Sequence, residues 1–298
     1  MRRVLHISLC VLFLSSIASA ELVQGIAIDF LTIGNPGNPG DTRPEANPSG
    51  CGSVGYTYQI GKYEVTNAQW YDFVTAAGAP TGNPSSAYDE SAHWTGDNIP
   101  TNMVSCYEVA QFCNYLTSGD KSQGAYRFSG NNSNPGDFEG IDRASAVSTY
   151  GIVYVIPTED EWYKAAYYTG SGYSTYANGT DAAPIAGVDT NYDMAIGQPW
   201  DVGVGNGTEE QNGTFDMMGN VWEWNEISPS VHLPGPRGGS YLYSDDYLRP
   251  SFRHDVDAWM EDINVGFRVA VIPEPATVLL LGLAGLALRR TRRVRNSE

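Results

Sequence analysis

Three segments of the chain combine a helix-capping signal with apolar positions at helical spacing. In each, a Ser or Thr stands three residues before a Glu or Gln, so the two side chains can satisfy free N–H groups at a helix start. The pairs are Thr66 with Gln69, Ser105 with Glu108, and Thr158 with Glu161. Apolar residues three and four apart follow the first two pairs, namely Trp70, Phe73 and Val74, and then Val109, Phe112, Cys113 and Leu116. The pattern predicts three short helices.

Alternating apolar and polar positions predict strands early in the chain. The segments IAIDFLTIG (26–34) and YTYQIGKYEVT (56–66) alternate in this way, and a run of turn formers separates them. Two later segments, 118–150 and 169–212, are rich in Gly, Asn, Ser and Asp, which predicts long loops. Because helices and strands do not alternate as βαβ units, a doubly wound parallel sheet is not expected. The predicted fold is an irregular α+β domain.

The first twenty residues have the features of a secretory signal peptide. Two arginines precede an apolar run from Val4 to Ile17, and the tripeptide Ala-Ser-Ala at 18–20 offers a cleavage site. We therefore expect signal peptidase to remove residues 1–20 on export.

The opposite end, residues 273–298, resembles a PEP-CTERM sorting signal. A Pro-Glu-Pro motif at 273–275 precedes an apolar run from Ala276 to Leu288 and a cluster of arginines. A helix of that length covers only about 20 Å, less than the ~30 Å hydrocarbon core of a bilayer. The resemblance implies processing by an exosortase-type peptidase and delivery to the cell surface, outer envelope or extracellular matrix, with a transient membrane anchor in the tail. An ordinary C-terminal anchor is the alternative.

The central part of the chain, residues 21–272, is predicted to be one acidic domain. The whole chain has a net charge of −17, and the arginines at both ends make the middle more acidic still. Such a charge repels phosphate backbones and anionic lipids, so nucleic acid is not expected as a partner, and membrane contact is expected only through the tail.

The cysteines limit the possible disulfides. Cys51, Cys106 and Cys113 remain after the signal peptide, and an odd number leaves at least one thiol free or paired with another molecule. Cys106 and Cys113 are seven residues apart in a predicted helix, which separates their Cα atoms by roughly 10 Å and prevents a bond. A disulfide would have to include Cys51, and we expect Cys113 to be a buried free thiol.

Six segments resemble, in order, the motifs of the formylglycine-generating enzyme family, or sulfatase-modifying factors. They read IGKYEVTNAQWYDFV, VSCYEVAQFCNYLT, IPTEDEWYKAAYY, GTFDMMGNVWEW, RGGSYL and NVGFRVA. The resemblance covers most of the central domain. It implies a variant of the C-type lectin fold with little regular secondary structure and long loops.

The same resemblance places the family's copper-binding cysteines at positions where this chain has none. In members that oxidise a sulfatase cysteine, two cysteines follow the RGGS motif, and their places fall here on Tyr243 and Leu248. Because Cu(I) requires soft thiolate ligands, we expect neither copper nor this oxidase activity. Another branch binds iron through several histidines. His93, His232 and His254 show no metal-ligand spacing, so iron is not expected either.

Calcium is the metal that the resemblance does imply. One family site falls on Asp216, the carbonyls of Gly219 and Val221, and Glu223, and a second falls on Asn191 and the carbonyl of Tyr192. Hard oxygen ligands of both kinds suit Ca²⁺. The alternative is a strand in which Trp222 and Trp224 fill the core. That alternative leaves the two carboxylates to be explained, since buried carboxylates need a cation or a donor.

Two classes of function remain. The first is a non-enzymatic surface protein, stabilised by calcium, that binds an extracellular polysaccharide or a surface protein. Its ligand would meet the aromatic and acidic side chains after the RGGS motif, which are Tyr241, Tyr243, Asp245, Asp246 and Tyr247, with Trp259 nearby. The second is an enzyme that oxidises a thiol or a protein cysteine at a rearranged metal site.

Overall fold

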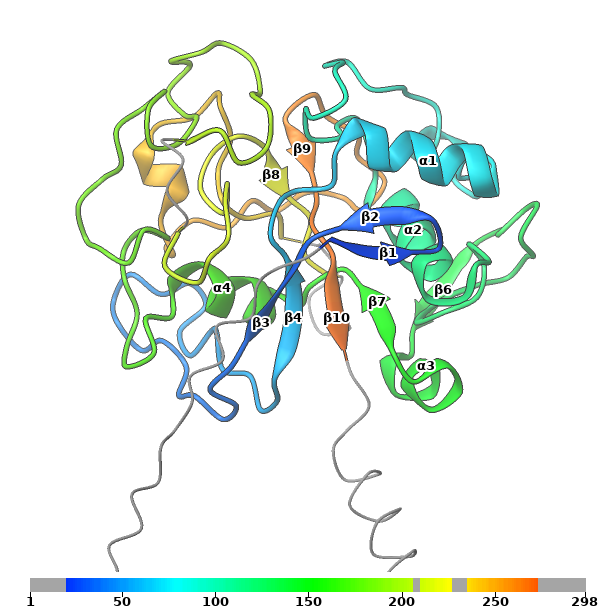
Figure 1. Ribbon diagram of the computed structural model, residues 1–298, viewed down its shortest axis with the longest axis horizontal. Helices are drawn as coiled ribbons and strands as arrows, with labels where there is room; N and C mark the ends of the chain where they lie inside the picture. Colours follow the sequence, from blue (N-terminus) through cyan, green and yellow to red (C-terminus); the bar gives the residue numbers. More distant parts are fainter. Residues whose placement is uncertain (1–19, 206–209, 227–234, 273–298) are drawn as a thin grey trace, which may run out of the picture.

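A four-stranded antiparallel sheet organises the structure, a computed structural model that describes residues 20–205, 210–226 and 235–272 (Figure 1). Its strand order is β3-β4-β10-β7. The strands are β3 (Phe30–Ile33), β4 (Tyr58–Gly61), β10 (Ala270–Ile272) and β7 (Val153–Val155). The last of these strands along the chain, β10, lies between β4 and β7, with Ala270 opposite both Ile60 and Val155. The sheet therefore joins segments from the two ends of the domain.

The described residues contain four helices, and all three predicted capping boxes are confirmed. The helices are α1 (Asn67–Ala77), α2 (Cys106–Ser118), α3 (Arg143–Tyr150) and α4 (Glu159–Tyr167). In α1, α2 and α4 the N-cap side chain accepts from the backbone N–H three residues on, and the Gln or Glu at that position reaches back. The predicted apolar face of α2 is buried, and on α1 Phe73 is buried while Trp70 and Val74 are partly buried against the hydrophobic core.

The segment 118–150 is not the long loop that its composition predicts. It contains a hairpin of β5 (Tyr126–Phe128) and β6 (Phe138–Ile141), followed by α3. The few aromatic residues of this polar segment decide its structure, since the rings of Phe128 and Phe138 pack 5.6 Å apart. Asp142 then caps α3 by accepting from the N–H of Ser145. By contrast, 169–205 contains turns and isolated bridges and no named helix or strand.

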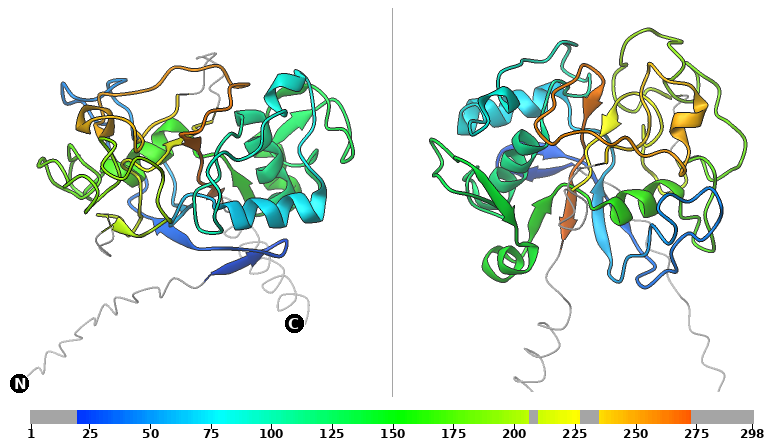
Figure 2. Two further views of the ribbon diagram at one scale, coloured as in Figure 1. Left: turned by 90° about the horizontal axis from the view of Figure 1, so that it is seen from above. Right: turned by 180° about the vertical axis from the view of Figure 1, so that it is seen from behind.

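The remaining elements are short. They are β1 (Glu21–Val23), β2 (Ile26–Ile28), η1 (Ser85–Ala87), β8 (Trp222–Glu223), η3 (Asp245–Leu248) and β9 (Val265–Gly266). The β1–β2 hairpin packs on α1, and β8 pairs in parallel with β9. In the views of Figures 1 and 2, α1, α2 and α3 gather on one side of the sheet, while the long loop before β8 and the 3-10 helix η3 lie on the other. The loop after η3 crosses back, and the carbonyl of Ala258 accepts from the N–H of Cys106 at the start of α2 at 3.0 Å. This mixed architecture confirms the predicted irregular α+β fold.

Two apolar clusters lie on the two sides of this arrangement. The first joins α1 and α2 to the sheet and includes both tryptophans of the GNVWEW motif. The second surrounds α4 and includes Tyr58, Trp162 and Leu248. The motif therefore lies close to both clusters.

No helix of the described part is long and apolar enough to span a lipid bilayer. The predicted apolar run from Ala276 to Leu288 and residues 1–19 of the predicted signal peptide lie outside the described residues.

Candidate functional site

The strand β8 carries a fully buried ion pair. Glu223 Oε1 accepts from Arg268 Nη2 at 2.5 Å, and Glu223 Oε2 accepts from Arg268 Nε at 2.5 Å and from Trp162 Nε1 at 2.7 Å. Neither charged side chain is more than 1% exposed. Three N–H groups, from Arg268 and Trp162, thus satisfy the carboxylate for which the family resemblance implied calcium. The positive charge beside Glu223 in this structure is the guanidinium of Arg268.

Two residues that the sequence argument missed hold the turn before β8. Asn220 Nδ2 donates to Glu64 Oε2 at 2.7 Å, and the N–H of Val221 donates to Glu64 Oε1 at 3.2 Å. Burial raises the pKa of the Glu64 carboxyl well above its ordinary value, and the charges of Asp216 and Glu223 raise it further. The sequence feature that could have identified Glu64 is its place inside the alternating YTYQIGKYEVT segment. A carboxyl group that is buried there needs hydrogen-bond donors or a cation.

The other two side chains predicted to bind calcium, Asp216 and Asn191, are also buried. Asp216 Oδ1 accepts from Trp200 Nε1 at 2.9 Å, and Oδ2 accepts from the N–H of Gly203 at 2.7 Å. Asn191 donates from its Nδ2 to the carbonyl of Gln198, while its Oδ1 is buried without a hydrogen-bond partner among the described residues. Since buried polar atoms are rarely left unpaired, this oxygen is the strongest sign of a missing ligand in the region.

The backbone brings the two predicted calcium sites together. Gly219 has a φ of 75°, and a Cβ there would lie 2.3 Å from the carbonyl oxygen of Asn191, so only glycine fits. The N–H of Asn220 donates to the same carbonyl at 2.8 Å. Tyr192 follows, and its hydroxyl donates to the carbonyl of Pro184. Within the described ranges, no three His, Cys, Asp or Glu side chains group closely enough to hold a metal ion. The calcium site stays a prediction.

The predicted core role of the two tryptophans is confirmed. Trp222 is 1% exposed and Trp224 is fully buried. The indole N–H of Trp224 donates to the carbonyl of Val104 at 2.8 Å. Trp222 instead packs against two tyrosines, and its ring centroid lies 5.6 Å from that of Tyr243 and 6.2 Å from that of Tyr247. Trp222 of the GNVWEW motif therefore packs against the segment after RGGS, which was predicted to bind the ligand.

Both positions at which the family's cysteines were expected have packing roles here. Leu248 is fully buried in the second cluster, and its carbonyl accepts from the Tyr167 hydroxyl at 2.8 Å. Tyr243 is half-buried between Trp222 and Tyr247, with the tyrosine rings 4.7 Å apart.

The predicted ligand residues divide into one buried residue and four at the surface. Tyr241 is buried, because Trp94 covers it and donates to its hydroxyl at 3.2 Å, so its inclusion in a surface set has to be corrected. Asp245 Oδ2 accepts from Arg249 Nη2 at 2.7 Å, and this hydrogen bond lowers the pKa of Asp245. Asp246 is exposed and lies 3.4 Å from the same guanidinium. Of the three predicted tyrosines, Tyr243 and Tyr247 are therefore the partly exposed ones, and the nearby Trp259 is 47% exposed.

Within the part of the chain that the structure describes, the cysteines and histidines form no common metal site. Cys51, Cys106 and Cys113 are all free and buried, as predicted for Cys113, and burial raises the pKa of the Cys106 thiol. Such thiols are poor nucleophiles and poor metal ligands at neutral pH. His254 packs 5.2 Å from the ring of Trp222, and burial lowers its pKa. His93 is exposed, and His232 lies outside the described residues.

Comparison with known proteins covers nearly the whole domain. A model of the sulfatase-modifying factor enzyme 1-like domain matches residues 34–272, and a model of the PEP-CTERM protein-sorting motif matches residues 271–293. Hercynine oxygenase of Mycolicibacterium thermoresistibile is 26% identical over 72% of this chain and 50% of that protein. The chain thus spans about half the length of this relative. The chaperone protein LppX of Paenibacillus barcinonensis is 26% identical over 67% of this chain and 75% of its own.

Solved structures share the fold. Treponema denticola variable protein 1 superposes with a TM-score of 0.58 at 20% identity, covering 88% of this chain and all of that one. PvdO from Pseudomonas aeruginosa superposes with a TM-score of 0.57 at 15% identity, over 82% of this chain and 94% of its own. The sorting motif indicates an exported protein of the cell envelope. The match over residues 34–272 shows that the chain belongs to the family of proteins with a sulfatase-modifying factor enzyme 1-like domain.

Proposed function

We propose that this chain is a non-catalytic, calcium-stabilised binding protein of the bacterial cell surface or matrix. The PEP-CTERM motif is consistent with processing by an exosortase-type system, and signal peptidase would remove the leader. The ligand would be an extracellular polysaccharide or a surface protein, held against Tyr243 and Tyr247. Aromatic rings with a hydroxyl tip suit sugars and peptides, because they offer an apolar face and a hydrogen bond.

One observation carries this proposal. The positions at which the family resemblance expects copper-binding thiols hold a fully buried leucine and a tyrosine within an aromatic stack. Packing groups at both positions support a contact surface around Tyr243 rather than a reaction centre that uses thiols. The acidic groups beside it, Asp245 and Asp246, are already paired with Arg249, so they shape the rim.

The alternative is an enzyme of the same family. Hercynine oxygenases are among the curated relatives, which favours an oxidase that uses a rearranged site. This alternative predicts bound copper or iron and oxygen consumption with a thiol substrate.

A binding assay separates the two. On an array of bacterial polysaccharides and surface proteins, the purified protein should bind a subset, and Tyr247→Ala should weaken that binding by about tenfold, roughly 1.4 kcal/mol. Tyr150→Ala is the matched control, since Tyr150 is 38% exposed on α3. Stoichiometric copper or iron with thiol-dependent oxygen uptake, or equal losses in the two variants, would contradict the proposal.

The proposal includes calcium as a structural cofactor. Of the predicted ligands, all except Glu223 could contribute oxygen atoms to it. The unpaired Oδ1 of Asn191 and the carboxylate of Asp216 would contribute hard oxygens. The carbonyls of Gly219, Val221 and Tyr192 would complete the set. Glu223 is engaged by Arg268 and would act only by keeping the turn in place. Bound calcium would tie the loop around Asn191 to the turn before β8.

Removal of calcium should therefore lower the melting temperature. At free calcium of about 100 times Kd, binding adds about 2.7 kcal/mol to the free energy of unfolding, and a chelator removes it. Asn191→Leu should abolish this difference, whereas Asn131→Leu, a control in the exposed turn before β6, should preserve it. A chelator that leaves the melting curve of the unaltered protein unchanged would refute the calcium site.

A further inference from the structure

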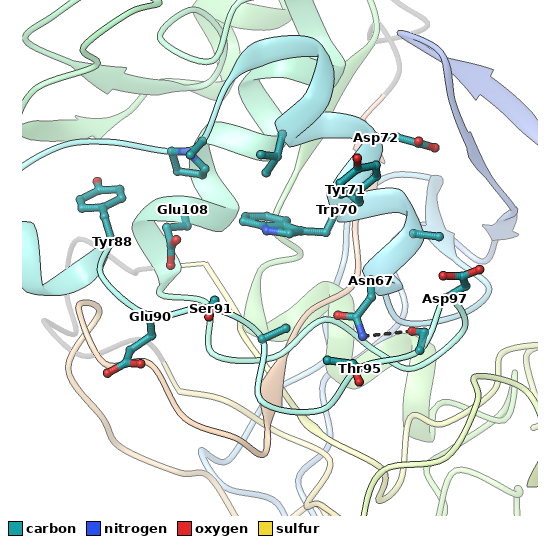
Figure 3. Close-up of a pocket in the computed structure, with 16 residues that line it drawn as sticks. Asn67, Trp70, Tyr71, Asp72, Tyr88, Glu90, Ser91, Thr95, Asp97 and Glu108 are labelled. Carbon is teal, nitrogen blue, oxygen red and sulfur yellow. Dashed lines mark hydrogen bonds between the residues drawn. The ribbon is translucent and has the colours of Figure 1, made fainter.

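A pocket lies between α1 and the loop from Tyr88 to Asp97, away from the GNVWEW segment (Figure 3). Its volume is about 650 Å³, within the range of small-molecule sites. Residues of α1 form one wall, the loop forms the opposite wall, and Glu108 of α2 lies at the end between them. It shares no lining residue with the predicted calcium site or with the Tyr243–Tyr247 surface.

The lining combines carboxylates with aromatic rings and has no basic side chain. The acids are Asp72, Glu90, Asp97 and Glu108, and the aromatic residues are Trp70, Tyr71 and Tyr88. Burial raises the pKa of the Glu108 carboxyl well above its ordinary value, so the negative charge comes from the other three acids. Among the described residues, no Lys, Arg or His lines the pocket, although Lys121 Nζ donates to the carbonyl of the lining residue Ala79 at 2.7 Å. A concave site of one charge sign concentrates its own field, so this pocket attracts cations and repels anions.

Trp70 supplies a face on which a cation can rest. Phe112 stacks on its indole with an interplanar angle of 20°, and Phe73 and Phe267 contact it edge-on. These contacts fix the ring from the core side, and Figure 3 shows the indole reaching into the pocket towards Glu108. The side chain of Trp70 is only partly buried, and it lines the pocket. A tryptophan face is the best aromatic partner for a cation.

Hydrogen bonds hold both walls in place. Asn67 Nδ2 donates to the carbonyls of Trp94 and Gly96, and the N–H of Ala68 donates to the carbonyl of Asp97. At the other end, the Gln111 side chain exchanges two hydrogen bonds with the backbone of Thr81. A preformed site loses little conformational entropy when a ligand binds.

We propose that this pocket binds an organic cation, an ammonium group on a small apolar body, against the Trp70 indole, with the carboxylates of Glu90 and Asp97 at the two ends of the loop wall supplying the negative field. The apolar body would contact Val74 and Tyr88, and Tyr71 would cover it at the rim, where its side chain is 70% exposed. The ammonium group would have anions on the loop side and a ring face on the α1 side. This proposal is independent of the polysaccharide or protein ligand proposed above.

Choline and its neutral isostere 3,3-dimethylbutan-1-ol test it directly. Calorimetry at physiological salt, which screens the general acidity of the surface, should show millimolar or tighter binding of choline and much weaker binding of the alcohol. The Glu90→Gln/Asp97→Asn double variant should bind choline about 3- to 20-fold more weakly. Trp70→Leu should lose about 5- to 20-fold if it folds.

Glu139→Gln on β6 is the matched control, because Glu139 is exposed and lies outside the pocket. Melting curves should show that the exposed Glu90 and Asp97 can be changed without loss of folding. Equal binding of choline and the alcohol would identify an apolar site and overturn the proposal. So would an equal loss in Glu139→Gln, or no binding of choline at millimolar concentration.

The pH dependence gives a second readout of the same site. Burial raises the pKa of Glu261 to about 7, and Glu108, Asp89 and Glu90 face it from α2 and the loop, with Tyr88 beside Glu108. A cation nearby favours the ionised carboxylate, so binding releases a proton. Choline affinity should therefore rise as the pH increases through about 7, and Glu261→Gln should remove most of this rise. Glu261 accepts from the N–H of Glu90 at 3.0 Å, so a flat profile in the unaltered protein would contradict a cation bound beside Glu90.

Discussion

Arg268→Met is expected to lower the free energy of unfolding by about 3–5 kcal/mol, a large share of the ~5–15 kcal/mol of a typical domain. The substitution leaves the buried carboxylate of Glu223 without its counter-charge. It also removes the donors that serve the carbonyls of Gly61 and Phe215. Urea unfolding followed by tryptophan fluorescence would measure the loss.

A double variant separates the charge from the packing. Glu223→Gln keeps an acceptor for Trp162 and removes the charge, so adding it to Arg268→Met should restore part of the stability, with a coupling energy of about 1–3 kcal/mol. Arg249→Met is the control, since Arg249 is 39% exposed in its pairs with Asp245 and Asp246. It should cost less than about 1 kcal/mol. If Arg268→Met lowered the free energy of unfolding by as little as Arg249→Met, the buried ion pair would not stabilise the fold.

The same variants test the role of Glu223 towards calcium. If Glu223 only supports the turn, saturating calcium should raise the melting temperature of Arg268→Met as much as that of the unaltered protein. If calcium instead rescued Arg268→Met selectively, the freed carboxylate would be acting as a calcium ligand, as the sequence argument first assigned it.

Local features of the fold could be predicted from the sequence, and contacts between distant segments could not. The capping boxes need only side chains three residues apart, so Ser105 and Glu108 were sufficient to begin α2. The partner of Glu223 lies 45 residues further along the chain, and no local pattern connects the two. Without Arg268, a buried carboxylate on a tryptophan-rich strand pointed to a metal ion. Arg268 lies just before β10, the strand that pairs with both β4 and β7 in the middle of the sheet.

The candidate sites also differ in whether their residues are consecutive or come from distant segments. Family motifs identified the turn before β8, because its residues are consecutive. The pocket of Trp70 was not predicted, since its walls come from α1, α2 and a loop that only the fold brings together. Trp70 itself was assigned to the apolar face of a helix, which is correct for one side of its ring. A pattern of apolar positions cannot show that the other side is open.

Trp222→Ala and Trp224→Ala are each expected to lower the free energy of unfolding by about 3–5 kcal/mol, because both indoles are buried in the first apolar cluster. Equilibrium unfolding in urea would measure both losses. If either variant unfolds like the unaltered protein, that ring is not part of the core.

The corresponding Phe variants distinguish the two tryptophans. The Trp222 indole N–H is buried without a partner among the described residues, so Trp222→Phe loses ring volume and no hydrogen bond. Trp224→Phe also leaves the carbonyl of Val104 unsatisfied, which adds about 1–3 kcal/mol. Trp224→Phe should therefore be the less stable variant, and the reverse order would contradict the assigned contacts.

Of the two tryptophans, only Trp222 should affect ligand binding at the Tyr243–Tyr247 surface. Its ring supports Tyr243 and Tyr247 from below, so Trp222→Phe should weaken binding at that surface, while Trp224→Phe should leave it unchanged in the folded protein. Neither variant should alter choline binding beside Trp70, because the two sites share no residues. A common loss of both activities would instead mean that the variants had disturbed the fold as a whole, and the separate surfaces could no longer be distinguished by mutation.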